Sequence, residues 1–446
     1  MKMQNEAILT RNPNGVPVYL AEQIRITEQG LYPDLYPATD WYKTMFNDVT
    51  SNQRANLSVS GGGKFARYYV AANITQDNGP LKIDNRNNFN TNISLTKYAI
   101  RTNVNVNLTN STELIFRLSS AFDEYTGPID GGADMYRKVM QANPVYFKPY
   151  YEPDEEYAYA NHVLFGNYGT ANYLNPYAES LRGYRDYSTN MTLTQFELKQ
   201  DLAMLTKGLN FRAMVNMNRF SEFSVSRSYT PFYYNISEYD MTGSTNPPYT
   251  LWRLNPGVNG DYIDYQPGNR NINTTFYLES TLEYNNVVAE THHFNGLLVY
   301  TMRQQKVGLA ENLQLSLPNR NLGVSGRFAY DYDTRYFVEF DFGYNGSERF
   351  AKKNRWGFFP SIGGAWMISN EQFFSSLKDV VSQLKLKGTY GLVGNDAIGS
   401  NNDRFYYLSQ VTMDAQRPTG WGLTGGGQNL GIDISRYAND EIGWEK

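Results

Sequence analysis

Apolar and polar side chains alternate with a period of two along much of this chain, and residues 336–344 display the pattern clearly. The charged positions of this segment are Glu339 and Asp341, and a tyrosine stands at each end. Because successive side chains of a strand point to opposite faces, the pattern predicts a strand with one charged and one apolar face. The apolar face consists of Val338, Phe340 and Phe342.

The same alternation recurs after residue 56 and predicts about fourteen strands, most of about ten residues. The clearest segments are 100–108, 114–122, 209–217, 276–284, 294–300, 328–332, 356–368 and 384–392. The connections between them alternate in length. Short connections are predicted at 108–112, 205–208 and 332–335, and long ones at 124–188, 221–273 and 413–440.

Strand length and loop layout together favour an all-β, antiparallel transmembrane barrel. A tilted membrane strand needs about 9–11 residues, whereas soluble strands average about 5–6. Tight turns at one end and long loops at the other are typical of outer-membrane barrels. We therefore expect Val338, Phe340 and Phe342 to face lipid, and Glu339 and Asp341 to face the lumen. A large soluble barrel, sandwich or propeller is the alternative.

Composition narrows the function classes. The chain has 446 residues, a formal net charge of -4 and no cysteine. The charge gives no electrostatic basis for binding nucleic acid, and the lack of cysteine excludes disulfides and thiolate metal sites. No apolar run approaches the roughly 18–20 residues of a membrane helix. The 37 tyrosines and 24 phenylalanines suit a β-protein.

The chain offers little catalytic or metal-binding chemistry. The glycine-rich residues 60–64 lack the spacing of a phosphate-binding loop and predict a hairpin turn. His292 and His293 are adjacent, so on a strand they point to opposite faces, and the third histidine is His162. The acidic residues 154–156 lie in a long connection and predict a solvated loop. We predict no enzyme activity, no cofactor and no metal site.

Binding of a ligand fits the sequence better than catalysis. The long loops are rich in aromatic, Asn and Asp residues, which suit sugar rings through stacking and hydroxyl hydrogen bonds, and also suit peptides. Tyr168, Tyr173 and Trp252 are the candidate ligand-binding residues. The alternative is that these aromatic side chains pack the loops against each other or against a partner.

Longer stretches of the sequence resemble a known family. DWYKTMFND at 40–48 and the segment 56–79 resemble the start of the barrel in SusC/RagA-type TonB-dependent transporters of the Bacteroidota outer membrane. Residues 317–371 resemble the most recognisable block of that family. KLKGTYGLVGNDAIG at 385–399 and a predicted strand at 404–411 continue the resemblance in the same order.

The resemblance implies a plug domain followed by a barrel of 22 strands. Residues 1–38 would then be the end of the plug and its linker, and residues 39–446 a partial barrel with long extracellular loops. Such a piece leaves two open strand edges, which lipid does not tolerate. We therefore expect a truncated gene model or an incomplete assembly.

The resemblance also implies a function and partners. It implies TonB-dependent import of an oligosaccharide, or of a peptide, across the outer membrane of a Gram-negative bacterium. A SusD-like surface lipoprotein would act as a lid, and TonB would act through an N-terminal region that this chain lacks. Outer-membrane lipid would surround a possible homodimer of transporter–lid pairs. The alternative is a soluble or surface β-rich glycan-binding protein without transport.

Overall fold

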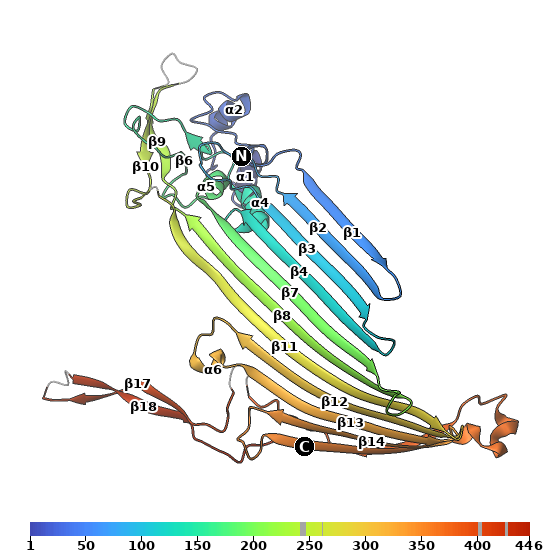
Figure 1. Cartoon of the computed structure of the whole chain (residues 1–446). Coiled ribbons are helices and arrows are strands. Elements are labelled where there is room, and N and C mark those ends of the chain that lie inside the picture. The colour runs from blue at the N-terminus through green and yellow to red at the C-terminus, as the bar shows by residue number, and fades with distance from the viewer. Residues whose placement is uncertain (241–246, 261, 400–403, 424–426) are drawn as a thin grey trace.

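One large antiparallel sheet dominates the computed structural model, which describes residues 1–240, 247–260, 262–399, 404–423 and 427–446. Twelve strands pair in this main sheet, and each pairs with its neighbour along the chain or across one long connection (Figure 1). In order across the sheet they are β1 (Asn52–Gly62), β2 (Ala66–Asn78), β3 (Ser94–Asn107), β4 (Thr112–Gly127), β7 (Gly183–Asp201), β8 (Leu209–Ser228), β11 (Asp264–Val288), β12 (His292–Val307), β13 (Asn319–Tyr332), β14 (Tyr336–Ser347), β15 (Trp356–Met367) and β16 (Lys385–Gly391).

The antiparallel all-β fold predicted from the sequence is confirmed. Each of the eight clearest segments falls on a strand of the main sheet, and the predicted short connections are tight turns at one end of it. The glycine-rich residues 60–64 lead into the hairpin turn between β1 and β2, as expected. Several strands are longer than predicted, since β7 has 19 residues, β8 has 20 and β11 has 25.

Two details of the predicted layout are wrong. Residues 404–409 form no strand, and β17 (Gln410–Trp421) begins only at Gln410. The expected long loop at 413–440 contains the hairpin of β17 with β18 (Gly427–Arg436). Likewise, β4 and β7 extend into the expected loop 124–188, and β8 and β11 into 221–273. In these strands, hydrogen bonds to the neighbouring strand continue into residues that no longer alternate between apolar and polar, so the sequence pattern does not predict them.

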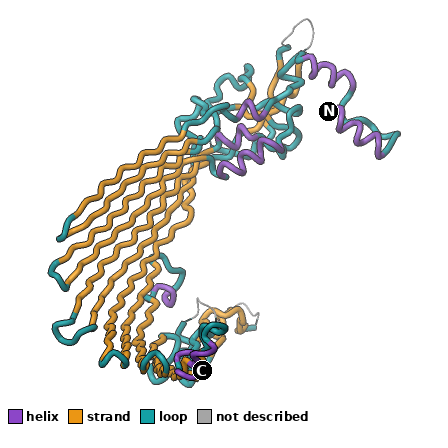
Figure 2. The backbone as a smooth tube through the Cα atoms, turned by 90° about the vertical axis from the view of Figure 1, so that its right-hand side faces the viewer, coloured by secondary structure: helices purple, strands orange, loops and turns teal. Residues whose placement is uncertain are grey.

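The connections between β2 and β3, between β4 and β7 and between β8 and β11 gather at the other end of the main sheet, together with the N-terminal residues (Figures 1 and 2). We call this region the cap and define it as the described residues of 1–51, 79–93, 128–182 and 229–263. Its elements are α1 (Lys2–Arg11), α2 (Ala21–Gln29), α3 (Trp41–Met45), α4 (Gly131–Gln141), β5 (Tyr150–Tyr151), β6 (Leu164–Gly166), α5 (Pro176–Leu181), β9 (Tyr233–Tyr239) and β10 (Tyr249–Arg253). Outside the cap lie α6 (Leu313–Ser316) and the short 3-10 turns Ile368–Asn370 and Gln372–Leu377. The connection between β15 and β16, residues 368–384, lies instead at the end of the tight turns.

The buried apolar core lies mostly in the cap. One cluster joins side chains of the N-terminal segment to the segment between β4 and β7, and Trp41, Met135 and Phe147 are central to it. The indole of Trp41 also donates to the carbonyl of Asn143 at 2.9 Å. A second cluster forms between β6, β9 and β10. The cap is thus a packed unit built from segments far apart in the sequence.

The N-terminal residues 1–38, expected to end a plug, pack against the other segments of the cap. The rings of Tyr19 and Tyr146 lie 6.1 Å apart, and Lys148 forms an ion pair with Asp34. Asn5 fastens α1 to the following loop, since its side chain donates to the carbonyl of Tyr19 and accepts from its amide. The boundary at residue 38 stays a prediction.

A glycine allows the turn between β7 and β8 to meet β11. Gly208 has φ +88°, and its carbonyl accepts a hydrogen bond from the amide of Asn285 at 2.9 Å. A Cβ at residue 208 would lie 1.8 Å from the carbonyl oxygen of Asn285. Only a residue without a side chain fits both the left-handed backbone and the close approach.

We expect Gly208→Ala to lower the free energy of unfolding by about 1–3 kcal/mol, because the turn must shift or remain strained. Urea unfolding in detergent micelles, followed by tryptophan fluorescence, measures the change. Gly63→Ala is the matched control, since no atom would lie within 4 Å of its Cβ. An equal loss in both variants would contradict the role assigned to Gly208.

Candidate functional site

The two faces of the main sheet differ in chemistry. On β14, Val338 is 52% and Phe340 40% exposed, while Glu339 and Asp341 on the opposite face both contact Arg327, at 3.5 and 2.8 Å. Phe342 is half-buried, because its ring packs 6.2 Å from Phe340. The predicted alternation of the two faces is therefore present. That one face contacts lipid and the other faces the lumen stays a prediction.

The apolar face of β14 continues across the other strands. The pairing register places large exposed apolar side chains of neighbouring strands on this same face, which we call the apolar face. They include Leu57, Val59, Val70, Ile74, Ile100, Phe196, Met217, Leu298, Phe328 and Ile362. Within the described part of the chain, these side chains remain uncovered.

The opposite, polar face carries charges that neutralise one another across strands. Arg212 on β8 contacts Glu197 on β7 at 2.9 Å and Glu279 on β11 at 2.8 Å. Lys199 on β7 contacts Glu113 on β4 at 3.6 Å. These pairs balance part of the charge of the polar face and join neighbouring strands across it.

Tyrosine–tryptophan pairs mark the two ends of the apolar face around β14. Tyr336 stacks on Trp366 at an angle of 13°, and Tyr344 stacks on Trp356 at 17°. The two tyrosines are eight strand positions apart, which is about 26 Å along the strand. An outer-membrane barrel carries an apolar band of about 25 Å between two aromatic girdles.

Beyond this band the same face becomes polar toward the cap. On β4 and β7, the ring pair Phe116–Phe196 gives way closer to the cap to Glu124 and Ser188, whose side chains form a hydrogen bond of 2.7 Å. The strands therefore extend past the apolar band at the long-connection end, which explains why they are longer than predicted.

Two of the predicted ligand-binding residues come together in the cap. Tyr168 stacks on Tyr146 with ring centroids 4.9 Å apart, and Tyr173 meets Tyr146 edge-on at 5.1 Å. Tyr19 of the N-terminal segment packs on the same Tyr146. We call these four residues the tyrosine cluster. Tyr168 is 45% and Tyr173 40% exposed, so both rings can still contact a ligand.

A buried asparagine holds the exposed members of the tyrosine cluster in place. The side-chain oxygen of Asn167 accepts from the amides of Tyr168 and Tyr173, at 2.8 and 3.1 Å. Its amide group donates to the carbonyl of Tyr173 at 2.8 Å. Sequence reasoning missed Tyr146, Tyr19 and Asn167, because only the fold brings these segments to the same place.

Trp252 stands apart from the tyrosine cluster. It lies on β10, opposite Asn235 of β9, and is 62% exposed. Its neighbour Leu251 points the other way into the second apolar cluster of the cap. Within the described residues, no aromatic contact joins Trp252 to Tyr168 or Tyr173, so the three candidates do not form one site.

A four-residue ion network closes the base of the segment between β4 and β7. Lys138 of α4 contacts both Asp130 and Glu179, and Arg182 contacts the same two carboxylates at 2.9 and 3.2 Å. Burial alone would raise the pKa of Asp130, but the hydrogen bonds from Lys138 and Arg182 hold it below its usual value. Asp130 closely follows β4 and Arg182 precedes β7, so the network joins the two ends of this segment.

A second polar contact fastens the loop after β2 to the cap. Arg86 pairs with Asp84 at 2.7 Å, and its guanidinium lies 3.9 Å from the ring centre of Tyr150. The hydroxyl of Tyr177 donates to the same Asp84. Burial alone would raise the pKa of Asp84, yet the hydrogen bonds from Arg86 and Tyr177 outweigh it and lower the pKa to about 2.

The histidines and acidic residues do not form a metal site in the part of the chain that the structure describes. His292 bonds to the hydroxyl of Tyr330 and His293 to Asp331, both at 2.8 Å, from opposite faces of β12 as expected. His162 lies in the cap, 2.8 Å from the hydroxyl of Tyr234. Among the described helices, none is long and apolar enough to cross a bilayer.

Comparison with known proteins gives relatives along almost the whole chain. No family model matches it. The TonB-dependent receptor SusC of Bacteroides thetaiotaomicron is 26% identical over 455 residues, which cover 96% of this chain and 42% of SusC. TonB-dependent receptor P26 of Formosa agariphila is 22% identical, covering 93% of this chain and 38% of P26. The chain thus spans about two-fifths of the length of these curated relatives.

Solved structures agree on the fold. The RagAB peptide transporter matches with a TM-score of 0.53 and 18% identity, over 99% of this chain and 48% of the matched chain. The RagAB peptide importer in its open-open state matches with a TM-score of 0.55 and 17% identity, over 100% and 48%.

The fold and the relatives define the class first: the chain is an antiparallel β-protein that is similar to TonB-dependent receptors along almost its whole length. More narrowly, the relatives include SusC and the structural neighbours include the RagAB transporter, in agreement with the SusC/RagA-type resemblance of the sequence motifs. These relatives are named as receptors, which agrees with the prediction that the chain is not an enzyme.

The low pKa of Asp84 makes attachment of the loop at 79–93 dependent on pH. The folded pKa of about 2 lies below the ordinary value of 3.8, so the carboxylate stabilises the folded loop above about pH 4. That stabilisation is lost as the pH falls toward 2. We expect hydrogen-exchange protection factors of residues 79–93 to fall between pH 4 and pH 2.

Asp84→Asn should lower this protection at pH 6 and remove most of its dependence on pH. Asp134→Asn is the control, because Asp134 pairs with Arg137 of the same helix and not with Arg86 or Tyr177. If Asp84→Asn keeps the full dependence on pH, another group controls the loop.

Proposed function

We propose that this chain forms part of a TonB-dependent importer in the outer membrane of a Bacteroidota-like, Gram-negative bacterium. Its cargo is an oligosaccharide, with a peptide as the second class. The observation that carries the proposal is the distribution of side chains on the main sheet. Apolar side chains stay exposed on one face, while charges pair on the other.

A soluble protein would bury the apolar face, because each Å² of exposed apolar surface costs about 25 cal/mol in water. Here the large exposed residues form a continuous band, and Tyr336–Trp366 and Tyr344–Trp356 stand at its ends. Lipid would cover this band, and the aromatic pairs would lie at the two interfaces. This arrangement favours the membrane over a soluble or surface glycan-binding protein.

The layout of connections suggests an orientation. Outer-membrane barrels have short periplasmic turns and long extracellular loops. By that rule the cap faces the outside and the turns such as 333–335 face the periplasm. The contacts of Tyr19 with Tyr146 and of Asp34 with Lys148 favour an outer position for residues 1–38 over the plug expected from the sequence. Residues 39–446 remain assigned to a partial barrel.

The tyrosine cluster is the proposed place of cargo contact. Tyr168 and Tyr173 present exposed rings in a fixed geometry, and aromatic faces stack on the apolar faces of sugar rings. Peptides are the second class, since the RagAB neighbours are named as a peptide importer. Trp252 is a separate, more exposed candidate on β10.

The proposal includes the partners implied by the resemblance. They are TonB, a SusD-like surface lipoprotein over the cap, outer-membrane lipid and a second transporter–lid pair. Support for TonB comes from the relatives, which are named TonB-dependent receptors, and support for a lid from the two-component RagAB neighbours.

A charge on the apolar face tests the membrane assignment. Phe340→Arg should destabilise the assembled protein by about 2–4 kcal/mol, because the guanidinium would lie near the middle of the bilayer. The amount of heat-modifiable protein in the outer-membrane fraction measures assembly. Phe340→Leu is the matched control and should assemble normally; normal assembly of the arginine variant would refute the assignment of this face to lipid.

Uptake tests the function itself. A strain without the gene should fail to grow on at least one oligosaccharide or peptide as sole carbon source, and the gene should restore growth. The double variant Tyr168→Ala, Tyr173→Ala should bind that cargo about tenfold more weakly, because two stacking rings are lost. Tyr159→Ala is the control, since Tyr159 is 77% exposed in the cap and outside the cluster. Unchanged growth of the gene-deleted strain on every cargo would refute import.

A further inference from the structure

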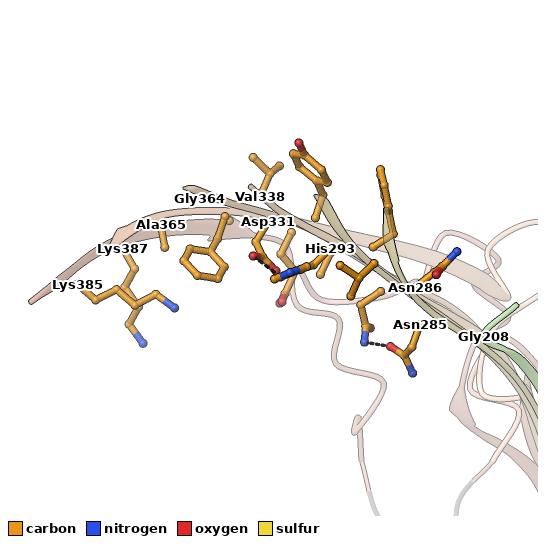
Figure 3. Close-up of a pocket in the computed structure, with 18 of the residues that line it drawn as sticks. Gly208, Asn285, Asn286, His293, Asp331, Val338, Gly364, Ala365, Lys385 and Lys387 are labelled. Carbon is orange, nitrogen blue, oxygen red and sulfur yellow. Dashed lines mark hydrogen bonds and ion pairs between the residues drawn. The ribbon is translucent and has the colours of Figure 1, made fainter. Parts of the chain in front are cut away.

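A groove of about 810 Å³ lies on the polar face of the main sheet, at the end opposite the cap. It runs from β11 to β16, and Gly208 of the β7–β8 turn stands at one side (Figure 3). The tyrosine cluster contributes nothing to its lining. The groove is therefore a separate candidate ligand site, distinct from the tyrosine cluster.

The pairing register explains why the sheet is hollow here. One row across the strands pairs Asn295 with Ala329, Ala329 with Glu339 and Glu339 with Gly363. The next row on the same face pairs Asp331 with Phe337 and Phe337 with Ala365. The three small residues Ala329, Gly363 and Ala365 leave space where the polar face otherwise carries longer side chains.

The groove has polar groups of two kinds on its sides. On one side, the amide of Asn295 donates to the side-chain oxygen of Asn285. On the other side, Lys385 and Lys387 stand on β16, two positions apart and on the same face (Figure 3). The ammonium of Lys385 lies 4.4 Å from the ring centre of Phe337.

Charge in the groove is unbalanced toward positive. The lining holds three lysines, Lys207, Lys385 and Lys387, against the two carboxylates of Asp331 and Glu339. Glu339 also meets Arg327 at 3.5 Å. Lys207 and Lys387 have no acidic partner within 4.0 Å in the described part of the chain. A bound anion would balance the positive charge of these lysines.

We propose that this groove binds a carboxylate-bearing ligand, either an acidic sugar or a peptide with a free C-terminal carboxylate. Two positions along a strand are about 6.6 Å, so the ammonium groups of Lys385 and Lys387 can reach one carboxylate together. Asn285 and Asn295 offer donors and acceptors to the hydroxyl or amide groups of the same ligand, and Phe337 offers a ring face.

The place of the groove in import rests on the proposed function. If the cap faces outward, the groove lies at the periplasmic end of the lumen wall, where cargo leaves. A weak and salt-sensitive site suits that place, because exposed lysines hold an anion loosely and are screened by ions. Binding itself does not depend on transport and can be measured without it.

Titration calorimetry of the full chain in detergent micelles tests the proposal. The probes are digalacturonate, the neutral disaccharide maltose, the dipeptide Ala-Ala and its C-terminal amide. We expect saturable binding of at least one carboxylate probe and none of its uncharged counterpart. Which carboxylate binds more tightly decides between sugar and peptide. Raising sodium chloride from 50 to 500 mM should weaken binding at least threefold.

Variants locate the binding. Lys385→Gln with Lys387→Gln should weaken carboxylate binding at least fivefold, and Ala329→Leu should fill the hollow and weaken it without changing any charge. Lys64→Gln is the control, since Lys64 lies in the β1–β2 turn outside the groove. Circular dichroism establishes that each variant keeps its strand content.

Several results would overturn the proposal. They are no binding of either carboxylate, equal binding of charged and uncharged probes, or an equal loss in the Lys64 variant. Failure of import is a separate result, since a gene-deleted strain with unchanged growth leaves the calorimetry unaffected. Conversely, intact uptake with no carboxylate binding would refute the groove alone.

Discussion

The register of the antiparallel ladder is the constraint on which the rest of this structure depends. Side chains alternate between faces with a period of two, so a slip of one residue in any strand would exchange its two faces. Apart from a shift between Pro267 and Arg270, the register continues across the twelve strands, and it keeps Phe196, Phe328 and Phe340 on one face. It keeps the pairs of Arg212 and Arg327 on the other. The apolar band, the polar face and the groove are all consequences of this alignment.

The cap stabilises the long connections, which the main sheet does not cover. Long connections carry backbone groups that need partners and apolar side chains that need burial, and the sheet below offers neither in quantity. The cap supplies both for itself, with an apolar core around Trp41, Met135 and Phe147 and an ion network around Asp130. Buried amides such as Asn167 then set the positions of exposed rings. A rigid frame with exposed tyrosines suits recognition, because little conformational entropy remains to be lost on binding.

Local sequence pattern predicted the strands well and their ends less well. Alternation was sufficient to find β14 and β15, because period two is a property of the strand itself. It failed at 404–409, where no strand pairs with the chain, and it began β7 too late and ended β8 too early. In β7 the outward positions turn polar, as at Ser188, while hydrogen bonds to the next strand continue. Pairing is a relation between segments, which a single segment cannot show.

The sequence by itself determined the all-β class, the two chemical faces of each strand, the absence of cysteine chemistry and the resemblance to SusC/RagA-type transporters. These properties reside in residue identity, spacing and ordered motifs. Only the tertiary structure decided that Tyr168 and Tyr173 meet Tyr146, that Trp252 stands apart, and that residues 1–38 join the cap. It alone decided that Ala329, Gly363 and Ala365 leave a hollow beside Lys387. The physical reason is the same throughout: contacts between distant segments depend on chain geometry, and no local period encodes it.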